Sequence, residues 1–323
     1  MESGKFIDFA TAVADSMGNG YIEVPIFEKE ITNLTHKRGI MLQRIVARPA
    51  TGHPTRYFEQ IARQNVAAFR DPRNLDTAWG EPTRREKSAF IKAVTSGIKF
   101  SHFDMEVGAQ QGQFPTLKSD DLTDMVNDVL TAQDSKLWTG ADTDLTSPTS
   151  NEYVGLLTQI KQTATIADST RMAVAIRTEF ARLAANKEKN VTPSLIVMNP
   201  LTLDLMEQEE EKTENHVKFY EVEAVPGIKV RGIMTCMGVI PIVTDPFLPV
   251  TTATNVATHK IVILSENLLR RFYIGSDKVR VFEIGHQADT SLAQKFMALQ
   301  YDTIVAKGAD YAHTILEKKV TVA

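Results

Sequence analysis

The chain has 323 residues, of which 36 are basic and 40 acidic, so its formal net charge is −4. This length is enough for two domains or for one large domain with inserted segments. A single cysteine, Cys236, excludes a disulfide framework within the monomer and any metal site built from several cysteines. The mild acidity argues against a dedicated nucleic-acid-binding protein. No run of about 18 apolar residues spans a membrane, and no secretory signal pattern opens the sequence, so we expect a soluble cytosolic protein.

The first fifty residues are predicted to form an extended arm with short helical elements. Weak helical spacing over 6–17 is broken at Gly18, and a second helical pattern runs over 28–46. Neither segment has enough apolar residues for a compact core. Residues 1–51 are therefore interpreted as an N-terminal arm.

Residues 52–103 are predicted to form a long hairpin. Alternation over 55–61 indicates one strand, and 89–103 indicates a second. The connection between them is polar over 66–87, contains turn residues, and has no apolar cluster of core size. Connections longer than about fifteen residues without structure of their own are usually functional. We therefore expect a projecting arm that needs a partner.

The tip of this hairpin carries the candidate contact residues. Six basic and four acidic side chains are interspersed over 63–87, whereas phosphate binding favours uniform positive charge. We therefore favour pairing with another protein surface, and an ordinary charged loop is the alternative. Trp79 lies in the polar tip, where its own hairpin cannot bury it, which makes it a candidate anchor. The candidate inter-subunit contact residues are Arg63, Arg70, Arg73, Trp79, Arg84 and Arg85.

A long amphipathic helix is predicted over 119–138. Ser119 can cap its start, acidic residues occupy its first turn, and Gly140 follows its end. Apolar residues recur at spacings of three and four, and Trp138 is expected in the core. A helix of about twenty residues is about 30 Å long, so this one can act as the spine of a domain.

The second half of the chain alternates helices and strands. We predict a helix over 169–187, a buried strand over 194–198, and a further helix that Asn199 caps. The chain is expected to close with two paired strands, 294–306 and 310–318. Together these elements indicate an α+β fold with a mixed sheet. Further short strands are expected over 228–233, 239–244, 260–264, 271–274 and 279–284.

The sequence contains no motif for catalysis, nucleotide binding or metal binding. It lacks a phosphate-binding glycine loop, a serine nucleophile elbow and an H-E-x-x-H pair. No two of its seven histidines have the i, i+4 spacing of a helical metal site. Scattered serine, histidine and aspartate residues could assemble into a triad, as in most proteins of this size. We expect no enzymatic activity, no cofactor and no bound metal.

Two other features receive structural interpretations. Cys236 lies between two predicted strands and is expected to be a small buried apolar residue, with a reactive thiol as the alternative. The acidic run 207–211 is expected to be a solvated helix end, with a metal-binding or partner-binding patch as the alternative.

The order of these parts resembles the major capsid protein of tailed bacteriophages, the Hong Kong ninety-seven type of shell fold that is shared with encapsulins. In that family an N-terminal arm precedes an extended hairpin called the E-loop. A peripheral domain with a long spine helix, an axial domain and a return to the peripheral domain follow. The resemblance covers nearly the whole chain and depends on the order and length of the parts. Local similarity is found at 110–114 (QQGQF), 137–140 (LWTG) and 196–200 (IVMNP).

The resemblance implies a subunit that self-assembles into an icosahedral shell around double-stranded viral DNA. The shell would be assembled in the host cytoplasm and become the virion capsid; the alternative is the shell of an encapsulin-like bacterial nanocompartment. The implied partners are other copies in hexamers and pentamers, a separate scaffolding protein, a portal, a decoration protein and packaged DNA, and no membrane. The implied parts are the arm 1–51, the E-loop with its flanking strands 52–103, the peripheral domain 104–152, the axial domain 153–285 and the return 286–323.

Overall fold

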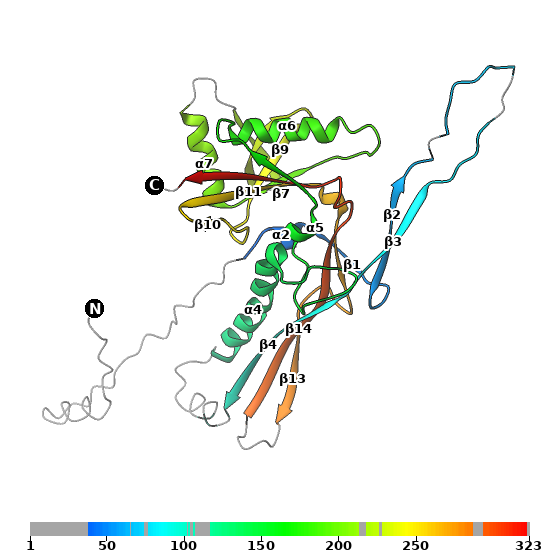
Figure 1. Ribbon diagram of the computed structural model, residues 1–323. Coiled ribbons are helices and arrows are strands. Elements are labelled where there is room, and N and C mark those ends of the chain that lie inside the picture. The colour runs from blue at the N-terminus through cyan, green and yellow to red at the C-terminus, as the bar shows by residue number, and fades with distance from the viewer. Residues whose placement is uncertain are drawn as a thin grey trace, which may run out of the picture.

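The computed structural model describes residues 38–64, 66–73, 77–101, 103, 106, 117–212, 218–225, 228–286 and 293–321. Within them the chain forms two sheets, each covered by helices, and one projecting hairpin (Figure 1). Most of the predicted arm, residues 1–37, and the QQGQF segment at 110–114 lie outside this part. The mixture of helices and strands confirms the predicted α+β class.

Five strands form the first sheet: β1 (Val46–Pro49), β4 (Lys92–Ser101), β12 (Leu269–Tyr273), β13 (Arg280–His286) and β14 (Ala293–Ala306). Strand β14 is its centre, because it pairs antiparallel with β4 on one side and with β12 and β13 on the other. Strand β1 joins parallel to β12.

Helix α4 (Leu117–Thr139) covers the first sheet and confirms the predicted spine helix. Its side chains Met125 and Val129 are buried against Phe296 and Ala298 of β14. The apolar face of the helix thus packs on the apolar face of the sheet, as expected for two packed layers.

Among the described residues, eight strands form the second sheet: β5 (Gln162–Ile166), β6 (Leu195–Met198), β7 (Phe219–Val225), β8 (Ile228–Thr235), β9 (Gly238–Thr244), β10 (Thr251–Ala253), β11 (Val256–Leu264) and β15 (Thr314–Thr321). Their order is β5-β15-β11-β6-β9-β8-β7, with β10 beside β11. Strand β6 is the predicted buried strand, and all four of its side chains are buried.

Two helices pack on the second sheet, α6 (Met172–Ala184) and α7 (Pro200–Glu211). The Asn199 side chain accepts a hydrogen bond from the Leu201 amide at the start of α7, which confirms the predicted cap. Phe180 of α6 and Met206 of α7 are fully buried and belong to one apolar cluster with residues of the sheet.

A shared apolar cluster joins the two sheets through α2 (Met41–Arg44), the end of α4 and α5 (Leu156–Gln159). Trp138 is fully buried in it, as predicted, and its indole Nε1 donates to Asp245 Oδ2 at 3.0 Å. A short helical turn, η1 (Glu266–Leu268), leads from β11 into β12 and so links the sheets. No described helix is long and apolar enough to cross a membrane.

The hairpin departs from the prediction in its second strand. Strand β2 (Thr55–Ala62) pairs with β3 (Thr83–Ala89), which lies mostly in the segment predicted as a polar connection. The strand predicted over 89–103 appears as β4 and pairs with β14 instead. Strand β3 was missed because its outer residues are exposed on both faces, so no alternation marks it.

The predicted pairing of the last two strands is wrong. Strands β14 and β15 are both present, but β15 lies between β11 and β5 in the second sheet. The turn around Gly308 sends the chain from one sheet to the other, so residues 286–323 contribute a strand to each.

Two interpretations of single features are also wrong. Cys236 is exposed, because it lies in the turn between β8 and β9. The acidic run 207–211 is not simply solvated, since Glu210 is buried and pairs with Arg171 at 3.0 Å. Its neighbour Glu209 pairs with Lys318 of β15 at 2.7 Å, so the run fastens α7 to the rest of the domain.

Candidate assembly interface

The root of the hairpin is packed on the first sheet. Tyr57 of β2 is buried, and its ring stacks on Phe272 of β12 with 6.3 Å between ring centroids. Ala89 of β3 and Val305 of β14 complete this cluster. Burial raises the pKa of the Tyr57 phenol, so the ring stays neutral and acts as an apolar contact.

A single carboxylate fastens the root to the junction of the two sheets. Glu59 Oε1 accepts a hydrogen bond from the Gly308 amide at 3.0 Å, in the turn between β14 and β15. Glu59 Oε2 pairs with Lys87 Nζ of the facing strand at 2.6 Å. Charge-assisted bonds of this kind are stronger than neutral ones, so both hairpin strands are held at this level.

A loop after α4 supports the root from the other side. The Phe90 amide donates to the Leu145 carbonyl at 3.0 Å, and Lys92 Nζ pairs with Asp142 Oδ2 at 2.6 Å. Burial opposes ionisation of Asp142, but hydrogen bonds from Lys92 and Thr149 outweigh it and lower its pKa to about 2. The carboxylate therefore stays charged and keeps the loop closed against the hairpin.

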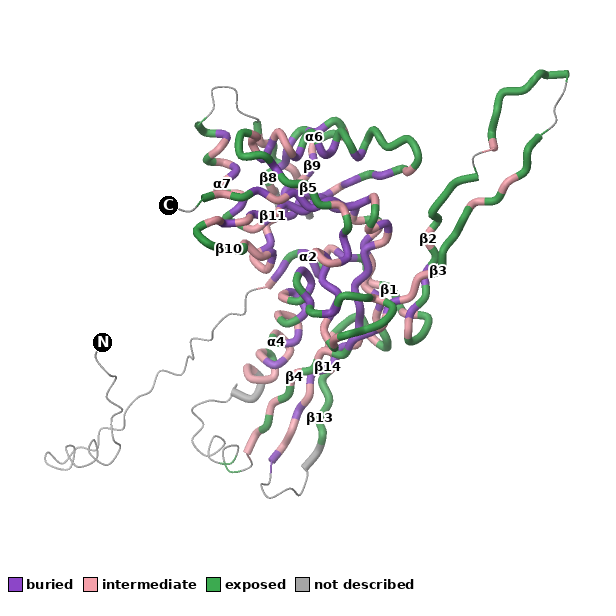
Figure 2. The backbone as a smooth tube through the Cα atoms, in the orientation of Figure 1, coloured by how far each residue is buried: buried purple, intermediate pink, exposed green. Residues whose placement is uncertain are grey.

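Beyond this root the hairpin leaves the body of the protein (Figure 2). Along β2 the burial alternates up to Tyr57 and then ends. Three aromatic side chains are left in solvent: Phe58 is 68 % exposed, Trp79 is 90 % exposed and Phe69 is fully exposed. Monomeric proteins rarely expose large apolar side chains together, and such groups mark interaction sites.

All six candidate contact residues are exposed. Arg84 and Arg85 are on β3, and the other four belong to the loop between the strands. Within the described residues, none of the five arginines is in an ion pair with the protein's own carboxylates. Sequence reasoning missed Phe58 and Phe69. Successive side chains of a strand point to opposite faces, so an inward Tyr57 implies an outward Phe58, and the alternation over 55–61 could have identified Phe58.

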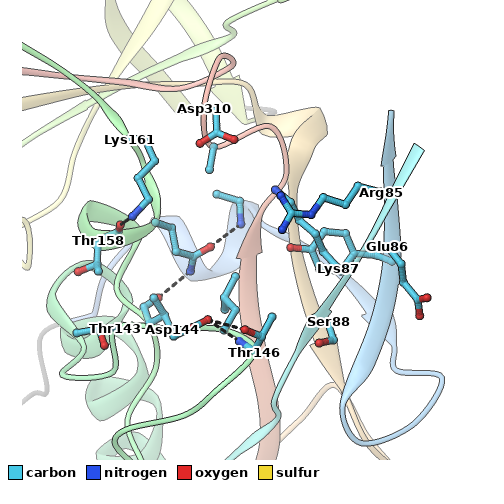
Figure 3. Close-up of a pocket in the computed structure, with 16 residues that line it drawn as sticks. Arg85, Glu86, Lys87, Ser88, Thr143, Asp144, Thr146, Thr158, Lys161 and Asp310 are labelled. Atoms are coloured by element: carbon cyan, nitrogen blue, oxygen red, sulfur yellow. Dashed lines mark hydrogen bonds between the residues drawn. The ribbon is translucent and has the colours of Figure 1, made fainter. Parts of the chain in front are cut away.

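A cavity of about 450 Å³ lies between the hairpin root and the supporting loop (Figure 3). Its labelled lining includes Arg85 and Lys87 from β3, Asp144 from the loop, and Lys161 and Asp310 from the segments that precede β5 and β15. The Asp144 carboxylate accepts bonds from the Thr146 amide and hydroxyl, both at 2.8 Å, so it holds the loop. In the described part of the chain no three His, Cys, Asp or Glu residues are placed to bind a metal ion.

Several solved structures are similar over almost the whole chain. The capsid of a native GTA particle has a TM-score of 0.64 at 15 % identity, covering 96 % of this chain and 99 % of that chain. The capsid of Myoviridae phage XM1 has a TM-score of 0.61 at 12 % identity, covering 93 % and 99 %. The SrpI encapsulin of Synechococcus elongatus has a TM-score of 0.58 at 12 % identity, covering 97 % and 95 %.

This chain has the tailed-phage capsid fold. The fold is shared with encapsulins, as the third similarity shows, and it confirms the resemblance drawn from the order of the parts. No protein-family model and no curated protein matches the sequence. At identities of 12–15 %, the capsid fold is what these similarities establish, and the function has to be argued from the surface.

Proposed function

We propose that the chain is a major capsid subunit whose copies self-assemble into an icosahedral shell around double-stranded DNA. The observation that carries the proposal is the hairpin, a folded arm rooted in the body whose outer aromatic and cationic side chains have no partner in the described chain. In the shell each hairpin lies across a neighbouring copy. The proposal includes assembly in the host cytoplasm and a final location in the virion capsid.

The parts take their roles from this arrangement. The hairpin within residues 52–103 acts as the E-loop, and α4 acts as the spine helix of a peripheral domain. The second sheet with α6 and α7 acts as the axial domain. Of the predicted arm 1–51, the part that contains α2 and β1 belongs to the body, so the proposed N-terminal arm is limited to residues 1–37. One chain then makes several different contacts with its neighbours, and closed symmetry converts these contacts into a shell.

The energetics favour assembly over the isolated subunit. Burial of a large apolar side chain gives about 1.5–3 kcal/mol, and the hairpin offers Phe58, Phe69 and Trp79. Each subunit both gives and receives such contacts, so the folded state becomes more stable as the shell forms, through mass action.

Further partners belong to the same proposal. A scaffolding protein and a portal would guide closure, and packaged DNA would contact the inner surface without sequence specificity. A net charge of −4 suits this role, because a surface that does not bind phosphates strongly lets DNA move during packaging. A structure of phage G contains major capsid proteins together with gp26 decoration proteins, which supports a decoration protein as an additional partner.

An encapsulin-like compartment is the second candidate. Its support is the similarity to the SrpI encapsulin, which covers 97 % of this chain. Both candidates form closed shells, so they differ in content rather than in architecture.

Electron microscopy of the purified full-length chain tests the shared part of both candidates. Closed, uniform particles are expected, and a protein that stays monomeric at high concentration would contradict a shell-forming role. Nuclease-protected DNA within particles from the native source supports a capsid, whereas a co-purifying enzyme inside DNA-free particles supports the compartment.

A further inference from the structure

Three cationic side chains, Arg48, Arg270 and Lys307, lie on one face of the first sheet. In the parallel pairing of β1 with β12, Arg48 lies beside Phe272 and Val46 lies beside Arg270. Paired residues in a sheet project to the same face, so Arg48 and Arg270 share the face on which Phe272 meets the hairpin. Lys307 joins them there, because its Nζ lies 5.2 Å from the Tyr57 ring centroid and 5.9 Å from that of Phe272.

The positive charges of these three side chains repel one another. Burial lowers the pKa of Lys307, and Arg270 and Arg48 lower it further. The carboxylate that opposes this effect, Glu59, already pairs with Lys87 and with the Gly308 amide. Within the described residues, none of the three cations is in an ion pair. The free subunit thus retains a repulsion that an external anion would relieve.

We propose that Arg48, Arg270 and Lys307 form a docking surface for acidic side chains of a second copy of this chain. The inference rests on the proposed shell-forming function and assigns to it a contact separate from the hairpin tip. Arg48 is exposed, whereas Arg270 and Lys307 are half-buried, and Lys307 lies over the rings of Tyr57 and Phe272. Desolvated cations of this kind interact more strongly with a carboxylate than exposed ones do.

The surroundings favour a protein segment over a nucleic acid. Val46 lies on the same face and is 48 % exposed, and a protein segment can cover it while supplying a carboxylate, which a phosphate backbone cannot. A second copy also has an excess of carboxylates, since the chain contains 40 acidic and 36 basic residues.

The test is assembly of the purified full-length chain across a range of salt concentrations. The variant Arg48→Gln with Lys307→Met removes two charges and keeps the apolar stem over Tyr57. A matched control, Arg177→Gln with Lys319→Met, removes two exposed charges from α6 and β15, away from the cluster. At low salt we expect the cluster variant to need about fivefold more protein than the wild type to assemble. The difference should shrink at about 1 M salt, where the Debye length is about 3 Å.

Thermal unfolding of the unassembled subunit gives a second readout. A docking role predicts that the cluster variant is at least as stable as the wild type, because repulsion has been removed. A lower melting temperature together with unchanged assembly would make the cluster structural and overturn the proposal.

The remaining outcomes also decide. A cluster variant that assembles like the control at every salt concentration overturns the proposal. So does normal assembly combined with loss of DNA from filled particles at lower salt, because the partner would then be phosphate. If the wild type itself does not assemble, the proposed function fails, and this failure is visible before any variant is made.

Discussion

Two regions of the molecule place large apolar side chains in opposite environments. In the second sheet, Leu195 and Ile196 of β6 are fully buried between neighbouring strands and helices. In the hairpin, Phe69 and Trp79 are almost completely in solvent. Leu195 and Ile196 belong to a paired strand, whereas Phe69 and Trp79 lie in the loop between the paired strands β2 and β3. The comparison shows that the same residue types stabilise the subunit in one region and are available for association in the other.

The largest expected effect comes from removing the outer hairpin. Replacing residues 63–82 by Asn-Gly connects Ala62 to Thr83, which already face each other in the strand pair, through a two-residue turn. We expect a folded, soluble subunit that forms no closed shells, measured by sedimentation and electron microscopy. A Gly/Ser segment of equal length in the same place should also fail to assemble. Complete particles from either variant would contradict the role given to the hairpin.

The buried tryptophan tests the other side of the comparison. Trp138→Ala empties a fully buried site and should lower the free energy of unfolding by about 3–5 kcal/mol, measured by denaturant titration of the subunit. If this variant does not fold, Trp138→Phe provides a milder case, because it keeps an aromatic ring in the site while removing the bond to Asp245 and part of the buried volume, and it should cost about 1–3 kcal/mol. Unchanged stability in both would mean that the shared cluster does not hold the sheets together.

The stability of the body, but not of the hairpin, should respond to pH through Asp302. Burial raises the pKa of this carboxyl to about 6, against the hydrogen bond from Tyr153 and the charge of Arg271. Folding thus favours the protonated form, so stability falls as the pH rises from about 4 to about 6 and stays lower above that range. The difference corresponds to about 3 kcal/mol.

Asp302→Asn should remove this part of the pH dependence. Its amide oxygen can still accept the bond from the Tyr153 hydroxyl. A turn of the Gln133 amide, which presents Nε2 to Asp302 in the wild type, brings Gln133 Oε1 to the new N–H donors. Subunit unfolding measured between pH 4 and 7.5 should therefore show a flatter profile and higher stability above pH 6. A variant that keeps the wild-type slope would assign the titration to other groups.

The smallest expected effect belongs to Trp79→Ala. Subunit stability should stay within about 0.5 kcal/mol of the wild type, while each inter-subunit contact weakens by about 1–3 kcal/mol. The measurement is the protein concentration at which assembly begins. Leu201→Ala, on an exposed helix position at 65 % exposure, is the matched control. Equal thresholds for both variants would leave Trp79 as an ordinary exposed side chain.

Sequence reasoning succeeded where burial leaves a periodic pattern. Helix α4 and strand β6 were predicted within two residues at each end, because one packs a stripe and the other is buried on both faces. The exposed tip and the buried Trp138 were also predicted correctly. Each of these features depends on the residues of one short segment, so the sequence of that segment is enough to predict it.

The prediction failed where structure depends on distant partners or on solvent. Strand β3 is polar on both faces, and only its main-chain pairing with β2 defines it. The hydrogen bond that fastens the hairpin root joins Glu59 to Gly308, 249 residues away. The sequence around either residue contains no pattern that predicts a contact at this separation. The acidic residue Glu210 was taken as solvated because its partner, Arg171, lies on another element.

The bond between Glu59 and the Gly308 amide gives the hairpin a mechanical role. Gly308 lies at the turn where the chain passes from β14 in the first sheet to β15 in the second. The root of the hairpin is thus attached directly to the junction of the two sheets. In the proposed shell, a force that a neighbouring copy applies to the tip would therefore reach the junction between the two sheets through this bond.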